Sequence, residues 1–283
     1  MSWEHRVAAF NTATESANRM HNDAVAATYG YKGGLVPGVD VWAYMTRPCT
    51  DRWGLDFLER GIMDATFIAP VYDGEQLTVR LEDDGTLQVM GPDDEVRVTG
   101  SAQLVDGPED LPPPGKLPTV EVPYDPPPAS AEALAPGTVL GKLRYKHYTD
   151  PAAEYLDAIR ETSPLYQAGR IGHPGVLARQ ANYVLASSVK LGPWIHVSTK
   201  SWHRGVVNAG DMVETRGVVV DEFEKNGHRY VDLDVEIAAN EAPVWSARHR
   251  AIWQPRPAEV MSSSGGGALP ARPRPPGSPI DPT

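Results

Sequence analysis

The feature that most constrains this chain is an internal repeat, in which two segments carry the same motifs in the same order. Pro37-Gly38-Val39 recurs as Pro174-Gly175-Val176, 137 residues later. The run from Gly74 to Arg80 recurs from Gly210 to Arg216, at an offset of 136. Pro-Gly and Gly-acid pairs are also common turn sequences. Two ordered matches at nearly one offset nevertheless indicate a duplicated structural unit.

Proline marks the limits of the two copies. Of the 27 prolines, ten lie between Pro108 and Pro136 and eight between Pro255 and Pro282. Such segments cannot continue a helix or a central strand, and they have little apolar surface to bury. We therefore expect an acidic, Pro-rich linker at 107–136 and a disordered tail at 256–283. Two folded units remain, at 1–106 and 137–255.

Charge and cysteine content exclude several classes of protein. With 26 Lys and Arg against 37 Asp and Glu, the net charge of −11 argues against nucleic acid or an anionic membrane as a partner. The single cysteine, Cys49, rules out an internal disulfide and a cysteine-rich zinc site. The histidines show no metal-ligand spacing, so we expect no metal. Without a signal pattern or a membrane-length apolar run, the sequence predicts a soluble, cytoplasmic protein.

Both copies have the same coarse layout. Polar stretches at 11–29 and 151–163 are predicted to be helical. Each is followed by a Gly/Pro turn and an apolar helix, the first from Val39 to Met45 and ended by Pro48, the second from Val176 to Val189. Alternating runs at 76–81 and 230–237 predict half-buried antiparallel strands. A long central helix followed by antiparallel strands, formed twice, is an α+β design.

The residues before the first apolar helix form a signature. They read Ser16-Ala17-Asn18-Arg19-Met20-His21-Asn22-Asp23, then Tyr29-Gly30-Tyr31, then Val36-Pro37-Gly38-Val39. This resembles the MaoC-like (hydratase 2 type) family of hotdog-fold enoyl-thioester hydratases and dehydratases. The family pattern is Asp-x-Asn-Pro-Ile/Leu-His-x-Asp, a Gly-aromatic turn, and a His-Gly pair at the start of the central helix. Asn18, His21, Asp23 and Gly38 match that pattern, whereas Ser16 replaces its Asp and Pro37 replaces its second His.

The second copy resembles the same signature in a more eroded form. Glu161-Thr162-Ser163-Pro164-Leu165-Tyr166 aligns with Asp-x-Asn-Pro-Leu-His, so Glu161 takes the acid position and Tyr166 the His position. Gly175 then corresponds to Gly38. The resemblance covers both folded units and implies a double hotdog, in which one half of the pair often loses its catalytic residues. Here neither copy keeps the full set.

The implied chemistry assigns a role to each candidate residue. Hydration of an enoyl thioester needs a base, an acid and stabilisation of an enolate-like oxygen. His21 is the candidate for proton transfer, with Asn18 beside it and with Glu161 and Tyr166 assisting or lining the acyl site. Gly38 and Gly175 would let the thioester carbonyl approach a helix N-terminus, and Ser16 and Asp23 would line the substrate site. Two plainer readings stay open, in which the histidine is merely solvated and Pro-Gly merely begins a helix.

The carrier of the thioester adds a requirement for phosphate binding. The most basic stretch, between Lys190 and Arg204, offers Lys200 and Arg204 with tryptophans interleaved, although an ordinary solvated strand face would look the same. The resemblance thus implies an acyl thioester of coenzyme A or of an acyl carrier protein as the partner and no cofactor, and it allows a homodimer of double hotdogs. Rival activities are a hotdog thioesterase using Asp23 or Glu161, and a non-catalytic acyl-thioester binder or partner subunit.

Overall fold

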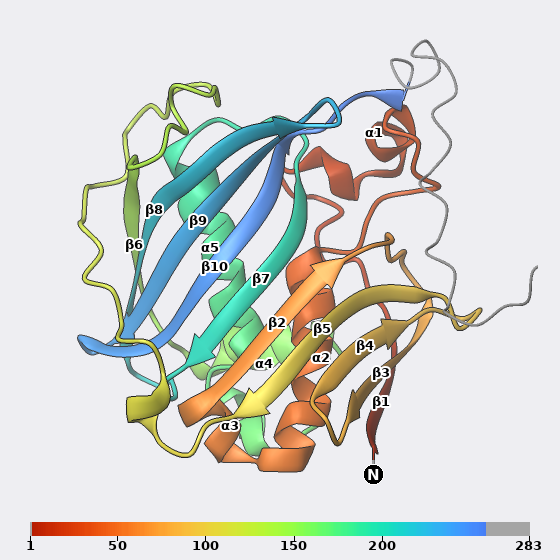
Figure 1. Ribbon diagram of the computed structural model, residues 1–283, viewed down its shortest axis with the longest axis vertical. Helices are drawn as coiled ribbons and strands as arrows, with labels where there is room; N and C mark the ends of the chain where they lie inside the picture. Colours follow the sequence, from red (N-terminus) through yellow and green to blue (C-terminus); the bar gives the residue numbers. More distant parts are fainter. Residues whose placement is uncertain (1, 259–283) are drawn as a thin grey trace, which may run out of the picture.

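One antiparallel sheet of ten strands wraps around two long helices in the computed structural model, which describes residues 2–258 (Figure 1). The first copy contributes β1 (Ser2–Ala8), η1 (Arg19–His21), α1 (Asp23–Thr28), α2 (Gly38–Trp53), α3 (Leu55–Arg60), β2 (Gly61–Phe67), β3 (Gln76–Glu82), β4 (Thr86–Met90) and β5 (Val96–Leu104). The second contributes β6 (Val139–Lys146), α4 (Thr149–Ala158), η3 (Pro164–Gly169), α5 (Pro174–Ser188), β7 (Ile195–His203), β8 (Met212–Lys225), β9 (His228–Ala239) and β10 (Ala242–Gln254).

The strand order shows that the two copies have the same topology. It runs β1-β3-β4-β5-β2-β7-β10-β9-β8-β6. Counted outward from the central pair β2 and β7, the strands of the second copy follow in the same order as their counterparts in the first. The pair β2 and β7 is antiparallel, with Met63 opposite Ser201 and Asp64 opposite Lys200. The repeat in the sequence is therefore a repeat in the structure, and the two sheets join edge to edge.

The outer face of the second half is stabilised by cross-strand ion pairs. On β9, acidic residues alternate with buried aliphatic ones, as the sequence predicts. Asp232 is directly opposite Arg250 and Asp234 is opposite Arg248, and both pairs are bidentate. Pairing opposite charges across strands fixes the register while the aliphatic side chains face the helices.

Helix α2 is longer than its sequence suggests. The prediction that Pro48 ends this helix is wrong, because the helix continues to Trp53 with Pro48 inside it. A proline within a helix costs about 3 kcal/mol. Most of the residues from Val39 to Thr50 are buried between the sheet and α5, and this burial on nearly every side outweighs the lost hydrogen bond.

The polar stretches before the central helices are less helical than predicted. In place of a helix over 11–29 there are only the short η1 and α1. Asn18 accepts a hydrogen bond from the Met20 N–H and Asn22 accepts one from the Val25 N–H, so each asparagine starts a new turn and the chain bends between them. In the second copy α4 ends at Ala158, and Arg160 adopts a positive φ of 59° before Glu161.

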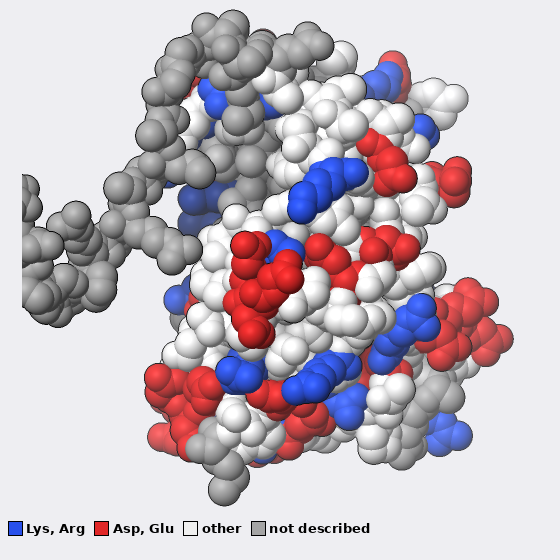
Figure 2. Space-filling model, turned by 90° about the vertical axis from the view of Figure 1, so that its right-hand side faces the viewer, with Lys and Arg blue, Asp and Glu red and all other residues white. Residues whose placement is uncertain are grey.

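The Pro-rich segment 107–136 runs along the second copy. It forms isolated bridges from Val120 to Gly141 and from Pro128 to Lys190, and it buries Leu134 completely. Of the tail predicted at 256–283, residues 259–283 lie outside the described part of the chain. On the face that Figure 2 presents, acidic and basic side chains are interspersed without an extended basic area. No helix among residues 2–258 is both long and apolar enough to span a membrane.

Candidate active site

His21 lies at the end of η1 with its tautomer fixed by the backbone. Its Nδ1 is 2.7 Å from the carbonyl oxygen of Leu35, and because a carbonyl can only accept, Nδ1 carries the proton. Nε2 is then unprotonated, and it accepts a hydrogen bond from Asn18 Nδ2 at 3.2 Å. Burial lowers the pKa of His21, against the opposing effect of the Leu35 carbonyl. The imidazole is therefore neutral at pH 7 and available as a base.

Asn18 ties this histidine to the second copy. Its Nδ2 donates to the carbonyl of Trp194 at 3.0 Å, and its Oδ1 accepts from the Trp194 N–H at 3.1 Å. This two-way contact holds η1 against the chain entering β7. Ser16, which replaces the acid of the family pattern, uses its hydroxyl to bond the backbone N–H and carbonyl of Asn18. The structure thus gives Ser16 a positioning contact at the loop, next to Asn18.

The N-terminus of α2 is open. Pro37 is the N-cap residue and provides no side-chain cap. The N–H groups of Asp40 and Val41 both bond the Pro37 carbonyl, whereas those of Gly38 and Val39 have no acceptor within the described residues. The first N–H groups of a helix are unpaired donors that carry partial positive charge. They are suited to receive a developing negative charge.

Two adjoining cavities meet at His21. The first has a volume of about 260 Å³ and a largely apolar lining. The second has a volume of about 710 Å³, and charged residues lie in its walls, namely Glu15, Arg179 and Lys190. Five residues line both: Asn18, His21, Pro37, Asn182 and Trp194. Gly38 and His196 line the first cavity, to which no Asp or Glu of the described residues contributes.

A buried ion pair joins the two central helices beside the second cavity. Asp40, at the start of α2, is fully buried, and Arg179 on α5 holds both of its carboxylate oxygens, at 2.9 and 2.8 Å. Thr12 completes the network, donating to Asp40 at 2.6 Å and accepting from Arg179 at 2.7 Å. This bidentate geometry fixes α2 relative to α5, and with them the walls of both cavities.

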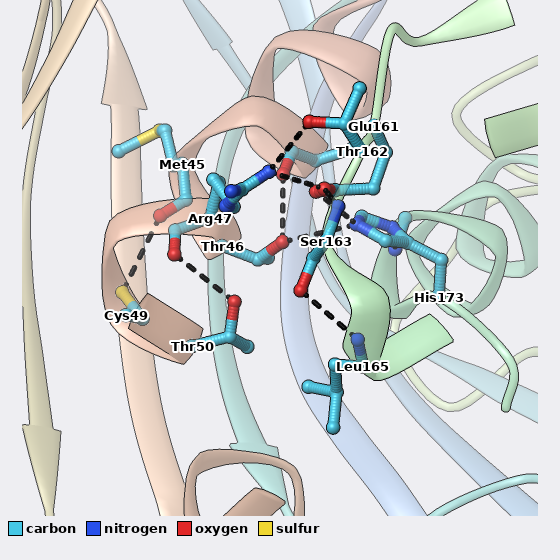
Figure 3. Close-up of polar contacts among 12 residues, drawn as sticks. Met45, Thr46, Arg47, Cys49, Thr50, Glu161, Thr162, Ser163, Leu165 and His173 are labelled. Carbon is cyan, nitrogen blue, oxygen red and sulfur yellow. Dashed lines mark hydrogen bonds and ion pairs between the residues drawn. The ribbon is translucent and has the colours of Figure 1, made fainter. Parts of the chain in front are cut away.

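The corresponding region of the second copy is filled by protein (Figure 3). Glu161 Oε1 accepts from Arg47 Nη1 at 2.8 Å and from the Ser163 N–H at 2.6 Å, and Glu161 Oε2 lies 3.6 Å from His173 Nε2. His173 Nδ1 accepts from the Gly175 N–H at 3.0 Å. The start of α5 is therefore capped by the protein's own histidine, where the start of α2 is free.

Tyr166 and Gly175 complete this closed arrangement. Tyr166 is fully buried, with its ring 4.5 Å from that of His173 between centroids. Burial raises the pKa of its hydroxyl well above the ordinary range. A Cβ added at Gly175 would lie 2.1 Å from the Tyr155 hydroxyl and 2.6 Å from Ala43 Cβ, so the glycine allows α5 to approach α2 closely. Glu161, Tyr166 and Gly175 line neither cavity at His21.

The remaining candidates lie apart from His21. Asp23 accepts the Gly34 N–H at 2.7 Å and so stabilises the turn that leads into α2. Lys200 is exposed on the outer face of β7, 5.8 Å from the Trp202 ring centroid. Arg204, the residue after β7, donates a hydrogen bond to Ser246 on β10. Of the predicted residues, the structure thus brings together His21, Asn18, Ser16 and Gly38.

The sequence analysis did not select Asn182 or Arg179, and it considered Trp194 and His196 only as part of the basic stretch that could hold the carrier, not as part of the site at His21. Trp194, Asn182, Arg179 and His196 come from the second copy, whereas the motif lies in the first. Only the packing of η1 and α2 against β7 and α5 brings them to His21, so no local pattern could have selected them. Among residues 2–258, no group of three His, Cys, Asp or Glu is arranged to hold a metal ion.

Acidification should weaken the closed cluster of the second copy. Although burial alone would raise the pKa of Glu161, His173, the Ser163 N–H and Arg47 together hold it at about 2, below the ordinary 4.5. A depressed carboxyl pKa stabilises the fold above the ordinary pKa, and this stabilisation is lost as pH falls from about 4.5 toward 2. We expect Glu161→Gln to lower the free energy of unfolding at pH 7 by about 3 kcal/mol, measured by urea denaturation.

The matched control is Glu154→Gln, which removes an exposed carboxylate from neighbouring α4. This variant should unfold like the parent protein at every pH. The deficit of Glu161→Gln should shrink between pH 5 and pH 3. A deficit that is equal at pH 7 and pH 3 would mean that the carboxylate is not held in its charged form by these contacts.

Comparison with known proteins identifies the fold through solved structures. No protein-family model matches the sequence, and no curated protein sequence matches it significantly. Solved structures do match. A protein assigned as a MaoC domain dehydratase from Chloroflexus aurantiacus is 12% identical, with a TM-score of 0.58 over 90% of this chain and 95% of that one. A MaoC-like dehydratase is 10% identical, with a TM-score of 0.56 over 88% and 97%.

A third structure is a double hotdog protein from Mycobacterium tuberculosis that is essential for bacterial survival during infection. It is 14% identical, with a TM-score of 0.60 over 89% of this chain and 95% of that one. The chain therefore has the double hotdog fold, which is shared with MaoC-like dehydratases. The α+β double hotdog predicted from the sequence is confirmed, and so is the structural resemblance to MaoC-like proteins.

Proposed function

We propose that this protein acts on an acyl thioester as a hydratase or dehydratase and that the active site belongs to the first copy. One observation carries the proposal: a neutral histidine with an unprotonated Nε2 and an uncapped helix N-terminus line the same cavity. A hydratase needs a base and a site for an enolate-like oxygen, and these two features supply both.

The chemistry can run on His21 as a single base. In the hydration direction, Nε2 takes a proton from water as the water oxygen bonds to C3 of the enoyl group. The electrons of the double bond move toward the thioester oxygen, to which the Gly38 N–H donates a hydrogen bond. The protonated His21 then delivers its proton to C2, so that one water has been added and the imidazole is neutral again. This route needs no carboxylate at position 16, where the family pattern has one.

The distribution of carboxylates favours this reaction over thioester hydrolysis. A hotdog thioesterase would direct water at the carbonyl with Asp or Glu. The first cavity has no such residue in its described lining, Asp23 is bonded to the Gly34 N–H, and Glu161 is held by Arg47 in the closed cluster. A non-catalytic binder remains the second candidate, supported by the hydroxyl that Ser16 presents in place of the acid.

The proposed partner is an acyl thioester of coenzyme A or of an acyl carrier protein. Arg179 and Lys190 line the second cavity, but Arg179 is paired with Asp40 and Lys190 with Asp125, and Glu15 is in the same wall, so this lining supplies no unpaired positive charge for the carrier. Lys200 and Arg204 line neither cavity, so a phosphate role for them stays a prediction from the sequence. A homodimer and a cytoplasmic location likewise stay predictions from the sequence.

One assay separates the candidates. Crotonyl-CoA is incubated with the protein while the conjugated absorbance and free thiol are followed in the same cuvette. We expect the absorbance to fall without release of thiol. Matching release of thiol would instead identify a thioesterase. No signal in either channel, with binding seen by calorimetry, would contradict catalysis and identify a binder.

A further inference from the structure

Asn182, on α5 of the second copy, carries an unpaired amide at the meeting point of the two cavities. Of the five residues that line both cavities, only Asn18 and Asn182 have side-chain amides. The amide of Asn18 is fully used, since its nitrogen donates to Trp194 and His21 and its oxygen accepts from the Trp194 N–H. No described residue forms a hydrogen bond with the side chain of Asn182, and its Oδ1 is buried without a partner.

The packing of α5 against α2 places Asn182 opposite the start of α2. Three close approaches define an antiparallel register between the two helices: Thr46 with His173, Ala43 with Gly175, and Asp40 with Arg179. Asn182 lies three residues beyond Arg179 on α5, and Pro37 lies three residues before Asp40. The register thus brings Asn182 level with Pro37, the N-cap residue of α2. Both residues line both cavities, as this arrangement requires.

The amide nitrogen is at the accessible end of this side chain. Oδ1 is the buried atom, whereas Nδ2 is not among the buried unpaired atoms. In the reverse orientation an NH₂ group with two hydrogens would be buried without an acceptor. Such orphaned donors are rarer in proteins than carbonyl oxygens without a donor. The side chain therefore presents two N–H donors, and no acceptor, at the end that is open to the cavities.

The corresponding residue of the first copy is apolar. At the offset of 137 that relates the Pro-Gly-Val motifs, Asn182 corresponds to Met45, which is fully buried. The same register puts Met45 opposite Pro174, the first residue of α5. That helix start is capped by His173, whereas the Gly38 N–H at the start of α2 is free. An amide thus lies opposite the open helix start and a thioether opposite the closed one.

Fold stability does not explain an asparagine at this position. Asparagine is a poorer helix former than leucine or methionine, because its short polar side chain competes for backbone hydrogen bonds. Its buried, unpaired Oδ1 is a further cost. Met45 shows that an apolar side chain packs well at the equivalent position of the first copy. The amide is therefore retained for a contact with a molecule that enters the cavities.

We propose that Asn182 is a further catalytic residue, whose Nδ2–H donates a hydrogen bond to the thioester carbonyl oxygen opposite the Gly38 N–H. The inference rests on the proposed function, because it requires a thioester whose carbonyl lies at the start of α2. No proton is transferred by Asn182. Its hydrogen bond strengthens as negative charge develops on the oxygen and weakens as the charge returns to C2, so it stabilises the transition state.

Infrared spectroscopy of a bound unreactive thioester tests this contact directly. Butyryl-CoA has no double bond to hydrate, and a carbonyl that accepts strong hydrogen bonds absorbs at lower frequency. The carbonyl band should shift down on binding to the parent protein. The shift should be smaller in Asn182→Leu, which keeps the shape of the side chain and removes its donor. It should not vanish, because the Gly38 N–H remains.

Turnover and stability show whether the amide acts on the substrate or on the fold. In hydration of crotonyl-CoA, Asn182→Leu should lower kcat by about 100-fold, the effect of losing one donor to an oxyanion, with KM within about threefold. Its urea midpoint should equal or exceed that of the parent protein, because leucine favours the helix. A purely structural role would lower the midpoint instead.

Gln180→Met is the matched control. Gln180 is another amide on α5, is 8% exposed, and lines neither cavity at His21. Its replacement removes the same chemical group from the same helix. The variant should keep the carbonyl shift and the kcat of the parent protein.

The outcomes separate the inference from the function on which it rests. A carbonyl shift in Asn182→Leu equal to that of the parent protein, or an unchanged kcat, overturns the inference alone. A parent protein that binds butyryl-CoA with the shift and yet never hydrates crotonyl-CoA overturns the proposed function alone. A parent protein that binds no thioester, or binds it without a shift, overturns both. If Asn182→Leu does not fold, Asn182→Ala decides by the same measurements.

Discussion

Replacement of His21 by alanine should lower kcat for hydration of a 2-enoyl thioester by about 10²-fold to 10⁴-fold. The side chain takes the proton from the water that attacks C3 and delivers it to C2, and its Nε2 is kept unprotonated by the Nδ1–H bond to the Leu35 carbonyl. KM should change far less, because the apolar lining of the first cavity and the helix N-terminus remain. The measurement is the loss of the conjugated absorbance of crotonyl-CoA at saturating substrate.

Tyr166→Phe provides the matched control for this variant. Tyr166 occupies the position of His21 in the second copy and is buried in the closed cluster away from both cavities. Loss of its hydroxyl should leave kcat unchanged. If the alanine variant at position 21 kept the activity of the parent protein while the tyrosine variant lost it, the active site would belong to the second copy.

The same account predicts a pH profile. His21 acts in its neutral form, and burial lowers the pKa of its imidazole below 6.5. Activity should therefore be constant around pH 7 and fall on the acid side, with a midpoint below pH 6.5. A midpoint above this value would mean that a different group acts as the base.

The second large effect concerns stability. Asp40→Asn should lower the free energy of unfolding by about 3 to 5 kcal/mol, because it leaves Arg179 without its counter-charge at a buried contact between α2 and α5. Urea denaturation at pH 7 measures this change. The comparison variant is Asp51→Asn, also on α2, whose pair with Arg47 is more exposed and should contribute less than about 1 kcal/mol.

The double variant Asp40→Asn with Arg179→Met shows whether the unpaired charge is the cause. Removal of both charges should restore much of the lost stability, since a buried pair can often be replaced by uncharged side chains at little net cost. A loss of less than about 1 kcal/mol in Asp40→Asn would mean that the ion pair is not what fixes the two helices. An equal loss in the single and double variants would point to the same conclusion.

Much of the fold could be predicted because the sequence repeats itself. Motifs at nearly constant offset place the same elements in each copy, and alternation along β3 and β9 marks their strands. Errors arose where tertiary contacts outweigh local signals. Burial of α2 carries the helix through Pro48, whereas the side chains of Asn18 and Asn22 break the preceding stretch into short turns.

The sequence predicted only those residues of the candidate site that lie close together in one segment of the chain. His21, Asn18 and Gly38 belong to one motif and line the first cavity together. Glu161 took the acid position of the motif in the second copy, yet Arg47 of the first copy pairs with it and closes that region. The position of Asn182 at the start of α2 depends on the packing of α5 against α2. No spacing within a single segment encodes such contacts.

The most direct test of the central claim is a crystal structure of the protein with butyryl-CoA. We expect the thioester carbonyl oxygen within hydrogen-bonding distance of the Gly38 N–H, and His21 Nε2 close to C2 and C3 of the acyl group in the first cavity. An acyl group bound at the closed cluster around Glu161, or lying away from His21, would contradict the account.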